Sequence, residues 1–318
     1  MRIVVLDGYT LNPGDLSWDR LAELGDLAVY ERTPADLITT RAAEAEVILT
    51  NKTPLSAETI AALPHLQYIG VLATGYNVVA VAACREQEIV ITNVPGYSTA
   101  SAAQMAFALL LEHCQRVGAH SNAVLAGEWS RQKDFCFWLH PLTELAGLTM
   151  GIIGMGQIGQ RVGTIAQAFG MQVIAHSRTH PEPPPLSNMA WGSLETVLKQ
   201  ADVVSLHCPL TDVTEGLINR ERLRLMKPTS FLINTARGGL LVDQDVAAAL
   251  NNDEIAGAGL DVLAAVEPPQ ADNPLLAAKN VIITPHIAWA AKASRQRLME
   301  TAVANVAAWV AGQPENTV

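Results

Sequence analysis

Short apolar runs alternate with amphipathic segments along most of the chain. In its first part these runs predict strands at 3–6, 27–30, 47–50, 68–72 and 89–92. Helical spacing of apolar positions fills the intervals, for example at 57–63 and 78–87. Buried strands that alternate with helices are typical of a doubly wound parallel sheet, because each crossover places a helix over the sheet. The pair Pro95-Gly96 interrupts the pattern and predicts the first crossing between domains.

The alternation resumes near residue 150 and predicts a second parallel sheet. Its strands are expected at 150–153, 172–175, 203–206, 231–234, 258–260 and 281–283. The proline-rich run 181–185 predicts an extended loop within this domain, since helical spacing resumes at 193–199. The segment 292–311 has helical spacing but no strand of its own to cover. We therefore expect it to return to the first domain.

The segment between the two sheets has two parts. Residues 99–115 are apolar nearly all round, which predicts a helix buried on several sides. Periodicity does not separate a core helix from one that contacts another subunit, so both remain open. The following connection, 118–147, is more irregular and carries Trp129, Phe135, Phe137 and Trp138. An aromatic cluster on a long connection indicates that the connection docks onto another surface.

Composition narrows the class of protein. A chain of 318 residues with 49% hydrophobic residues can bury two cores. Its net charge is -10 and its Lys and Arg residues are scattered, which argues against nucleic acid or a membrane as partner. Met1 leads directly into the first strand and the four cysteines lack paired spacing, so we expect reduced thiols in a cytoplasmic protein. The histidines show no metal-ligand spacing, and no metal is expected.

The motif Gly154-x-Gly156-x-x-Gly159 lies between an apolar run at 150–153 and a helical segment at 160–169. In this setting one glycine makes a tight turn, one lets the backbone approach a pyrophosphate, and one lets the helix pack on the strand. The pyrophosphate would bind at the positive end of the helix dipole. An ordinary glycine-rich turn is the alternative, but the flanking strand and helix favour a dinucleotide site.

Open α/β sheets bind ligands beyond the carboxyl ends of their strands. In the second sheet this rule selects an acid-base set of Arg237, Glu267 and His286. Taken singly, each would more commonly be a surface residue, whereas their joint placement beside the glycine loop predicts a catalytic site. The residues expected to contact the cofactor are Gly154, Gly156, Gln157, Ile158, Gly159, Ser177, Arg178, Thr179, Cys208, Pro209, Thr214, Thr235, Ala236, Arg237, Asp261, His286 and Ala288.

The end of the second strand of this sheet indicates which dinucleotide is bound. NAD-preferring sites place an Asp or Glu about 20 residues beyond the glycine loop, where it binds the ribose hydroxyls. Here the sequence is His176-Ser177-Arg178-Thr179, without a carboxylate. Ser and Arg can hydrogen-bond a 2′-phosphate, so we expect NADP(H) to be preferred over NAD(H), which remains possible. The alternative is a solvated Arg178 with no ligand.

Several segments, spread over nearly the whole chain, carry more specific patterns. They are GVLATGYN at 70–77, NVPGYSTAS at 93–101, GIIGMGQIGQ at 151–160, HCPLTDVTEGLIN at 207–219, NTARGGLLVD at 234–243 and TPHIAWA at 284–290. Together they resemble the D-isomer-specific 2-hydroxyacid dehydrogenases, and within them the glycerate dehydrogenase or hydroxypyruvate reductase branch. We expect a flavodoxin-like substrate domain, 1–98 with 289–318, and a Rossmann dinucleotide-binding domain, 99–288.

The resemblance implies roles for the strand-end residues. Arg237 would hold the substrate carboxylate and polarise the keto oxygen. His286 would donate a proton to that oxygen as the hydride reaches C2, and take it back during oxidation. Glu267 would accept a hydrogen bond from the other imidazole nitrogen and favour the charged ring. Backbone amides around Ala73, Thr74 and Gly75 would also meet the substrate carboxylate.

Two positions depart from the family pattern. The acidic partner lies six residues after Asp261 instead of five, which indicates a one-residue insertion at Ala264-Ala265. Val79-Ala80 replace the usual Asn-Asp, a change expected to affect packing more than chemistry. Resemblance to hydroxypyruvate reductases also suggests that an aromatic residue of the long connection, such as Trp138, enters a neighbouring subunit's site in a homodimer. A core tryptophan is the alternative.

The main hypothesis is an NADPH-dependent reductase of small 2-oxo acids such as hydroxypyruvate and glyoxylate. Two alternatives remain open: an NAD-preferring D-2-hydroxyacid dehydrogenase for bulkier oxo acids, and a nucleotide-sensing corepressor built on the same scaffold. The sequence leaves the preferred side chain of the substrate and the physiological direction undecided.

Overall fold

The computed structural model describes residues 1–263 and 267–318, and it divides into two compact units. The first unit contains Met1–Ser98 and Ala290–Val318, and the second contains Thr99–Trp289. The sequence-based division places the second crossing one residue earlier. No helix in the described residues combines the length and the apolar character needed to cross a membrane.

The first unit is built on a five-stranded parallel sheet with the order β2-β1-β3-β4-β5. Its strands are β1 (Arg2–Val5), β2 (Asp26–Val29), β3 (Val47–Thr50), β4 (Tyr68–Val71) and β5 (Val90–Thr92). This is the flavodoxin-like strand order, which reverses direction between β1 and β3. The parallel, doubly wound sheet expected from the apolar runs is therefore confirmed.

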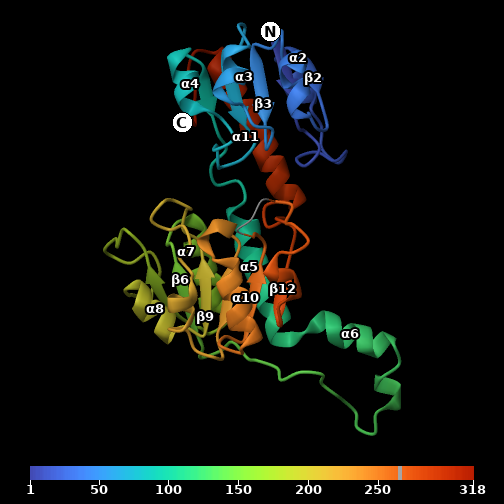
Figure 1. Ribbon diagram of the computed structural model, residues 1–318, viewed down its shortest axis with the longest axis vertical. Helices are drawn as coiled ribbons and strands as arrows, with labels where there is room; N and C mark the ends of the chain where they lie inside the picture. The colour runs from blue at the N-terminus through green and yellow to red at the C-terminus, as the bar shows by residue number, and fades with distance from the viewer. Residues whose placement is uncertain (264–266) are drawn as a thin grey trace. The chain divides into compact units, whose positions relative to one another are not determined.

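Helices cover both faces of this sheet. They are α1 (Asp19–Ala22), η1 (Ala35–Leu37), α2 (Ile38–Arg41), α3 (Ala57–Ala61), α4 (Val81–Glu86) and α11 (Lys292–Val310). Although α11 follows the second sheet in sequence, Leu298 and Val306 are buried against residues of the first sheet, and Figure 1 shows this red helix beside the blue strands. The Trp309 ring lies 5.1 Å from the Tyr68 ring, centroid to centroid. The C-terminal helix thus completes the N-terminal core.

The second unit has a seven-stranded parallel sheet with the order β12-β11-β10-β9-β6-β7-β8. Its strands are β6 (Thr149–Ile153), β7 (Gln172–His176), β8 (Met189–Trp191), β9 (Val203–Leu206), β10 (Phe231–Asn234), β11 (Gly257–Leu260) and β12 (Val281–Ile283). β8 was not predicted, because this edge strand has only three residues, too few to show a period. The doubly wound Rossmann-type sheet is confirmed.

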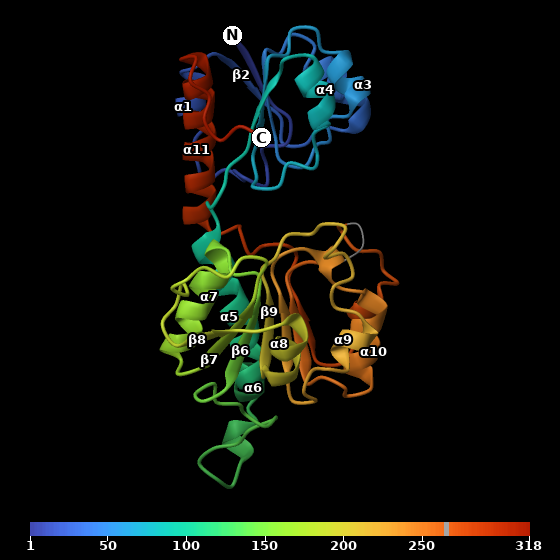
Figure 2. The same ribbon diagram turned by 90° about the vertical axis from the view of Figure 1, so that its left-hand side faces the viewer.

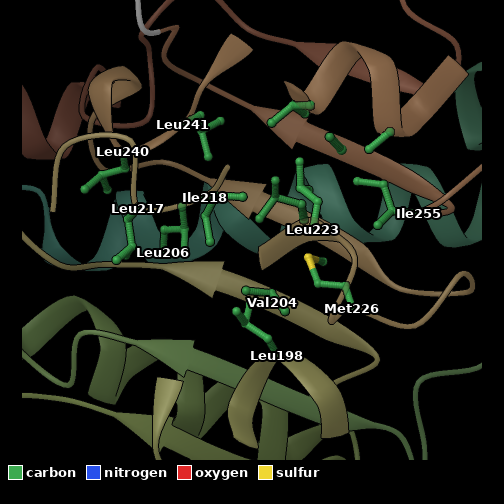
Figure 3. Packing of buried hydrophobic residues seen from close by; sticks show 14 of the residues in the cluster. Leu198, Val204, Leu206, Leu217, Ile218, Leu223, Met226, Leu240, Leu241 and Ile255 are labelled. Atoms are coloured by element: carbon green, nitrogen blue, oxygen red, sulfur yellow. The ribbon is translucent and has the colours of Figure 1, made fainter. Parts of the chain in front are cut away.

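Two sets of helices enclose the second sheet, as Figure 2 shows. One face is covered by α5 (Thr99–Gln115) and α7 (Gln157–Ala168), and the other by α8 (Leu194–Gln200), α9 (Arg220–Leu223) and α10 (Asp243–Asn251). Ala103, Phe107 and Leu110 of α5 are buried in the core, so this helix packs on its own sheet. On the opposite face, Val204, Leu223 and Met226 belong to the apolar cluster drawn in Figure 3. Both faces of the sheet are therefore covered by apolar side chains. The ends of the strands remain as the place for a polar ligand.

The connection after α5 is more regular than its sequence indicates. It forms α6 (Val117–Leu125) and η2 (Trp129–Arg131), which project from the rest of the second unit in Figure 1. Its apolar side chains are largely in solvent: Leu125 is 82% exposed, Phe135 89% and Trp138 68%. The expected irregular segment is thus an arm, which we define as residues 117–142, with an uncovered apolar surface.

Candidate active site

The glycine loop joins β6 to α7 at the carboxyl edge of the second sheet. Gly154 has a φ of 99°, and a Cβ there would lie 2.5 Å from the backbone nitrogen of Cys208. A Cβ at Gly159 would lie 2.1 Å from the carbonyl oxygen of Gly154. A Cβ at Gly156 would meet nothing within 4 Å. Two glycines therefore permit close backbone packing, and the third leaves open space.

The open space at Gly156 faces the start of a helix. Gly156 is the N-cap of α7, and the nitrogen of Gln160 donates to its carbonyl oxygen over 2.9 Å. The N–H groups of Gln157 and Ile158 lie before this first helical hydrogen bond, where a helix binds anions. The residues present therefore fit the pyrophosphate of a dinucleotide.

The end of β7 offers hydrogen-bond donors without a carboxylate. Ser177 is half-buried, while Arg178 and Thr179 are exposed. Arg178 forms no ion pair with any residue in the described ranges. The strand itself is held in place, since Nδ1 of His176 lies 3.2 Å from the carbonyl oxygen of Gly192. This geometry leaves the guanidinium available to a ligand.

The loop after β9 borders the glycine loop. Cys208 is half-buried there, and burial raises the pKa of its thiol. The Thr214 hydroxyl donates to the carbonyl oxygen of Pro209 over 2.7 Å and accepts from the nitrogen of Thr211 over 2.8 Å. The Thr214 side chain thus folds the loop that presents Cys208 and Pro209.

Arg237 follows β10 on a short, ordered loop. The Asn234 side chain donates to the carbonyl oxygen of Arg237 over 2.9 Å and accepts from the nitrogen of Ala236 over 3.0 Å. The Arg237 side chain is exposed, and its Nη1 donates to the carbonyl oxygen of Ala236 over 2.7 Å. The buried hydroxyl of Thr235 has no hydrogen-bond partner among the described residues. A fixed backbone therefore presents an exposed guanidinium and a hydroxyl suited to a bound ligand.

Asp261, at the end of β11, fixes the segment that carries His286. Its carboxylate, 1% exposed, accepts from the nitrogens of Ile287 and Ala288 over 2.9 and 2.8 Å. It also accepts from the Thr284 hydroxyl over 2.5 Å. His286 has a φ of 55°, in the left-handed region, which is uncommon for residues other than glycine. The hydrogen bonds to the Asp261 carboxylate hold the segment that contains His286 in place.

His286 and Glu267 form a pair. Nδ1 of His286 lies 2.5 Å from Oε2 of Glu267, and both side chains are partly exposed. The possible insertion at Ala264-Ala265 lies outside the described residues, yet Glu267 reaches the ring. Since Nδ1 faces the carboxylate, Nε2 is the ring nitrogen left for a substrate. A histidine oriented by a carboxylate can donate or accept one proton at Nε2.

The residues expected to bind the substrate through backbone amides lie in the first unit, after β4. The Thr74 hydroxyl donates to the carbonyl oxygen of Val94 over 2.8 Å, and the nitrogen of Val94 donates to the carbonyl oxygen of Ala73 over 3.0 Å. These bonds fix the turn that includes Gly75. Val79, at one of the two departures from the family pattern, is buried in the core of this unit.

The sequence reasoning missed Asp7, at the end of β1. Its carboxylate accepts from three successive backbone nitrogens, of Asn51, Lys52 and Thr53, over 2.7, 2.6 and 2.7 Å. The Asn51 side chain continues the contact to the carbonyl oxygen of Leu72 at the end of β4. An Asp that directly follows a buried first strand was the available signal.

Comparison with known proteins agrees with this layout. The model of the D-isomer specific 2-hydroxyacid dehydrogenase NAD-binding domain matches residues 107–288. A hydroxypyruvate reductase of Blautia hydrogenotrophica is 49% identical over 321 residues, which cover all of this chain and 99% of that protein.

Two solved structures that are similar to this chain contain different cofactors, one NADP and the other NAD. An NADPH-dependent glyoxylate/hydroxypyruvate reductase of Sinorhizobium meliloti, in complex with NADP and malonate, aligns with a TM-score of 0.85 and 30% identity over 100% of this chain and 96% of that one. The D-lactate dehydrogenase of Aquifex aeolicus, with NAD and lactic acid, aligns with a TM-score of 0.82 and 30% identity over 98% and 96%. The glycine loop, the family model and the relative that spans the whole chain lead to one conclusion: this chain belongs to the D-isomer specific 2-hydroxyacid dehydrogenase family of NAD(P)-dependent oxidoreductases.

Proposed function

We propose that this protein reduces small 2-oxo acids, hydroxypyruvate and glyoxylate, to D-2-hydroxy acids with NADPH. The observation that carries the proposal is the His286–Glu267 pair, placed at the same sheet edge as the glycine loop. Similarity over the whole chain to a hydroxypyruvate reductase supports this choice of substrate. When it is bound, the nicotinamide supplies the hydride chemistry.

In this mechanism His286 is the general acid and base. It holds a proton on Nε2 and gives it to the keto oxygen as C2 is reduced, and it takes the proton back during oxidation. Glu267 accepts the hydrogen bond from Nδ1 and fixes the orientation of the ring. The Asp261 carboxylate keeps the backbone around His286 in its left-handed conformation. In this proposal His286 carries the proton, Glu267 orients the ring, and Asp261 holds the backbone that positions the ring.

Substrate binding is assigned to a cation and to backbone amides. Arg237 binds the substrate carboxylate through its planar fork of donors and polarises the keto oxygen. The backbone amides at Ala73, Thr74 and Gly75 contribute further donors. The exposed guanidinium on an ordered loop supports this role for Arg237, because only its terminal atoms have to adjust to the substrate.

The preference for NADPH is assigned to Ser177, Arg178 and Thr179. These donors follow β7, where a dinucleotide's adenosine ribose binds in this fold, and they include no carboxylate to repel a 2′-phosphate. Replacing Arg178 with Ala should lower the ratio of kcat/KM for NADPH over NADH by about ten- to a hundredfold, the value of one charge-assisted hydrogen bond. An unchanged ratio would exclude this assignment.

We further propose a cytoplasmic homodimer, with the arm at the contact between subunits. Leu125, Phe135 and Trp138 are largely exposed on the same segment, and a group of exposed apolar side chains is typical of an interaction surface. Trp138 is the aromatic residue of the arm that we assign to the neighbouring subunit's site. Light scattering of the purified protein tests the dimer, and a monomer at micromolar concentration would contradict it.

The activity is tested by following NADPH oxidation with hydroxypyruvate, glyoxylate, pyruvate and phenylpyruvate, and repeating each assay with NADH. We expect the two smaller polar substrates to be reduced fastest. Binding of NADPH without turnover of any of the four acids would instead favour a nucleotide-sensing protein. Phenylpyruvate as the best substrate, with NADH, would favour a dehydrogenase for bulkier oxo acids.

A further inference from the structure

The loop that follows β7, residues 177–188, is fixed to the second unit at both of its ends. At its start, His176 contacts the carbonyl oxygen of Gly192 beside β8. At its end, the Gln167 side chain of α7 donates to the carbonyl oxygen of Ser187. The Leu186 side chain occupies the space that a Cβ at Gly163 would need. The residues between these contacts are therefore held near the end of β7.

His180 lies in this loop against the ring of Trp191. The two ring centroids are 4.6 Å apart and the planes are inclined by 19°, a stacked arrangement. Trp191 is the last residue of β8 and pairs with Ala175 of β7, and its ring packs on the core below α7. Because the indole is fixed by the sheet and the core, it holds the exposed imidazole of His180 in one place.

Side chains that can donate hydrogen bonds are concentrated around His180. The chain has a net charge of -10, yet His176, Arg178 and His180 follow one another at every second position. Glu182 is the acidic residue of the same loop, and no ion pair within the described residues involves any of the three basic side chains. Such a group of donors without carboxylate partners is suited to a phosphate.

We infer that His180, stacked on Trp191, is a further specificity-determining residue that contacts the 2′-phosphate of NADPH. This inference rests on the proposed NADPH preference. Arg178 supplies one set of donors, and the His180 imidazole supplies an N–H from two residues farther along the same loop. Stacking on the indole removes the freedom that an exposed side chain would otherwise lose on binding, which makes its hydrogen bond more favourable.

Two substitutions separate phosphate binding from packing. His180→Phe keeps an aromatic ring on Trp191 but removes every donor, whereas His180→Arg keeps a planar donor group that can also stack. Binding is measured by titration calorimetry of the full-length protein with 2′,5′-ADP, which carries the 2′-phosphate, and with 5′-ADP, which lacks it. These ligands report on the adenosine site without any turnover.

We expect His180→Phe to weaken binding of 2′,5′-ADP by about ten- to a hundredfold, the value of one charge-assisted hydrogen bond, while the affinity for 5′-ADP stays unchanged. His180→Arg should retain most of the wild-type discrimination. Equal discrimination in His180→Phe and the wild type would overturn the inference, and so would equal loss of both ligands, which would indicate a packing role.

Arg178→Ala distinguishes a failure of the inference about His180 from a failure of the proposed preference for NADPH. If Arg178→Ala loses discrimination and His180→Phe keeps it, the 2′-phosphate site stands without His180. If the wild type binds the two ligands equally, the proposed preference for NADPH is wrong and the inference falls with it.

Discussion

Asp7 in the first unit and Asp261 in the second have the same position and use it in the same way. Each follows a buried strand, and each carboxylate accepts hydrogen bonds from backbone nitrogens of the loop after a neighbouring strand. The loops they hold are different. Asp7 holds residues 51–53, none of which has a positive φ, whereas Asp261 holds His286 in the left-handed region. One arrangement thus shapes a surface loop, and the other holds the proposed proton donor in a left-handed backbone conformation.

The largest expected effect is a loss of kcat on replacing His286, which lies in the segment held by Asp261. His286→Asn removes the proposed proton donor but suits a left-handed backbone, and it should lower kcat for hydroxypyruvate reduction by about a thousandfold, within the usual range for general acid–base catalysis. NADPH affinity, measured by fluorescence titration, serves as the control and should change little. A loss of less than tenfold in kcat would show that another group delivers the proton.

The next effect concerns Glu267, which has no counterpart in the loop held by Asp7. Glu267→Gln can still accept a hydrogen bond from Nδ1 but removes the charge that stabilises a protonated ring. We expect kcat to fall about ten- to a hundredfold, because the pair loses electrostatic stabilisation while its geometry is kept. Glu182→Gln, in the loop after β7, is the matched control and should leave kcat unchanged.

The two aspartates themselves give the most direct test of the comparison. Asn offers one acceptor oxygen in place of two, so Asp261→Asn and Asp7→Asn should each lower the free energy of unfolding by about 2 kcal/mol, as expected for lost hydrogen bonds to a charged group. Only Asp261→Asn should also lower kcat, by about tenfold, because it releases the backbone around His286. Chemical denaturation and steady-state rates measure both. An equal loss of kcat in the two variants would remove the functional distinction.

The smallest expected effect is a difference between the two units in how much stability each loses at low pH. In the second unit, burial lowers the pKa of His113 and of His207 to about 4, from about 6.5 in the unfolded chain. Between these values the unfolded state binds more protons, so the second unit loses stability as pH falls below 6.5, by roughly 1 to 2 kcal/mol for His113 at pH 5. The first unit contains His65, which is exposed.

Hydrogen exchange at pH 7 and pH 5 checks this difference. Strands of the second unit should lose protection at pH 5 relative to strands of the first. His113→Leu should reduce that loss, because it removes a side chain that binds a proton more readily in the unfolded chain than in the buried native position. Equal loss of protection in both units would show that the buried histidines do not control acid sensitivity.

The sequence predicted the strands better than the surface elements. Strands such as β3 and β9 are buried along their whole length, and three of the four residues in each are apolar. α6 was missed because Val117, Val124 and Leu125 point to solvent, and an amphipathic pattern is recognisable only when one face is buried by the same chain. β8 has too few residues to show a period.

In the candidate site, too, some features could be predicted from the sequence and others could not. The strand-end rule selected His286 and Glu267, and the structure brings these side chains together. It could not reveal the role of the Asp261 carboxylate, whose partners are backbone nitrogens that look alike in any sequence. His180 and Trp191 are eleven positions apart in the sequence, and their contact depends on the fold of the segment between them, which no local pattern encodes.

The left-handed backbone at His286 implies a conflict between durability and turnover. Gly and Asn are better tolerated in that conformation than histidine. A screen for heat resistance that ignores activity would therefore favour replacement of the proposed proton donor itself. Attempts to make this enzyme more robust should leave position 286 fixed and strengthen the segment around it.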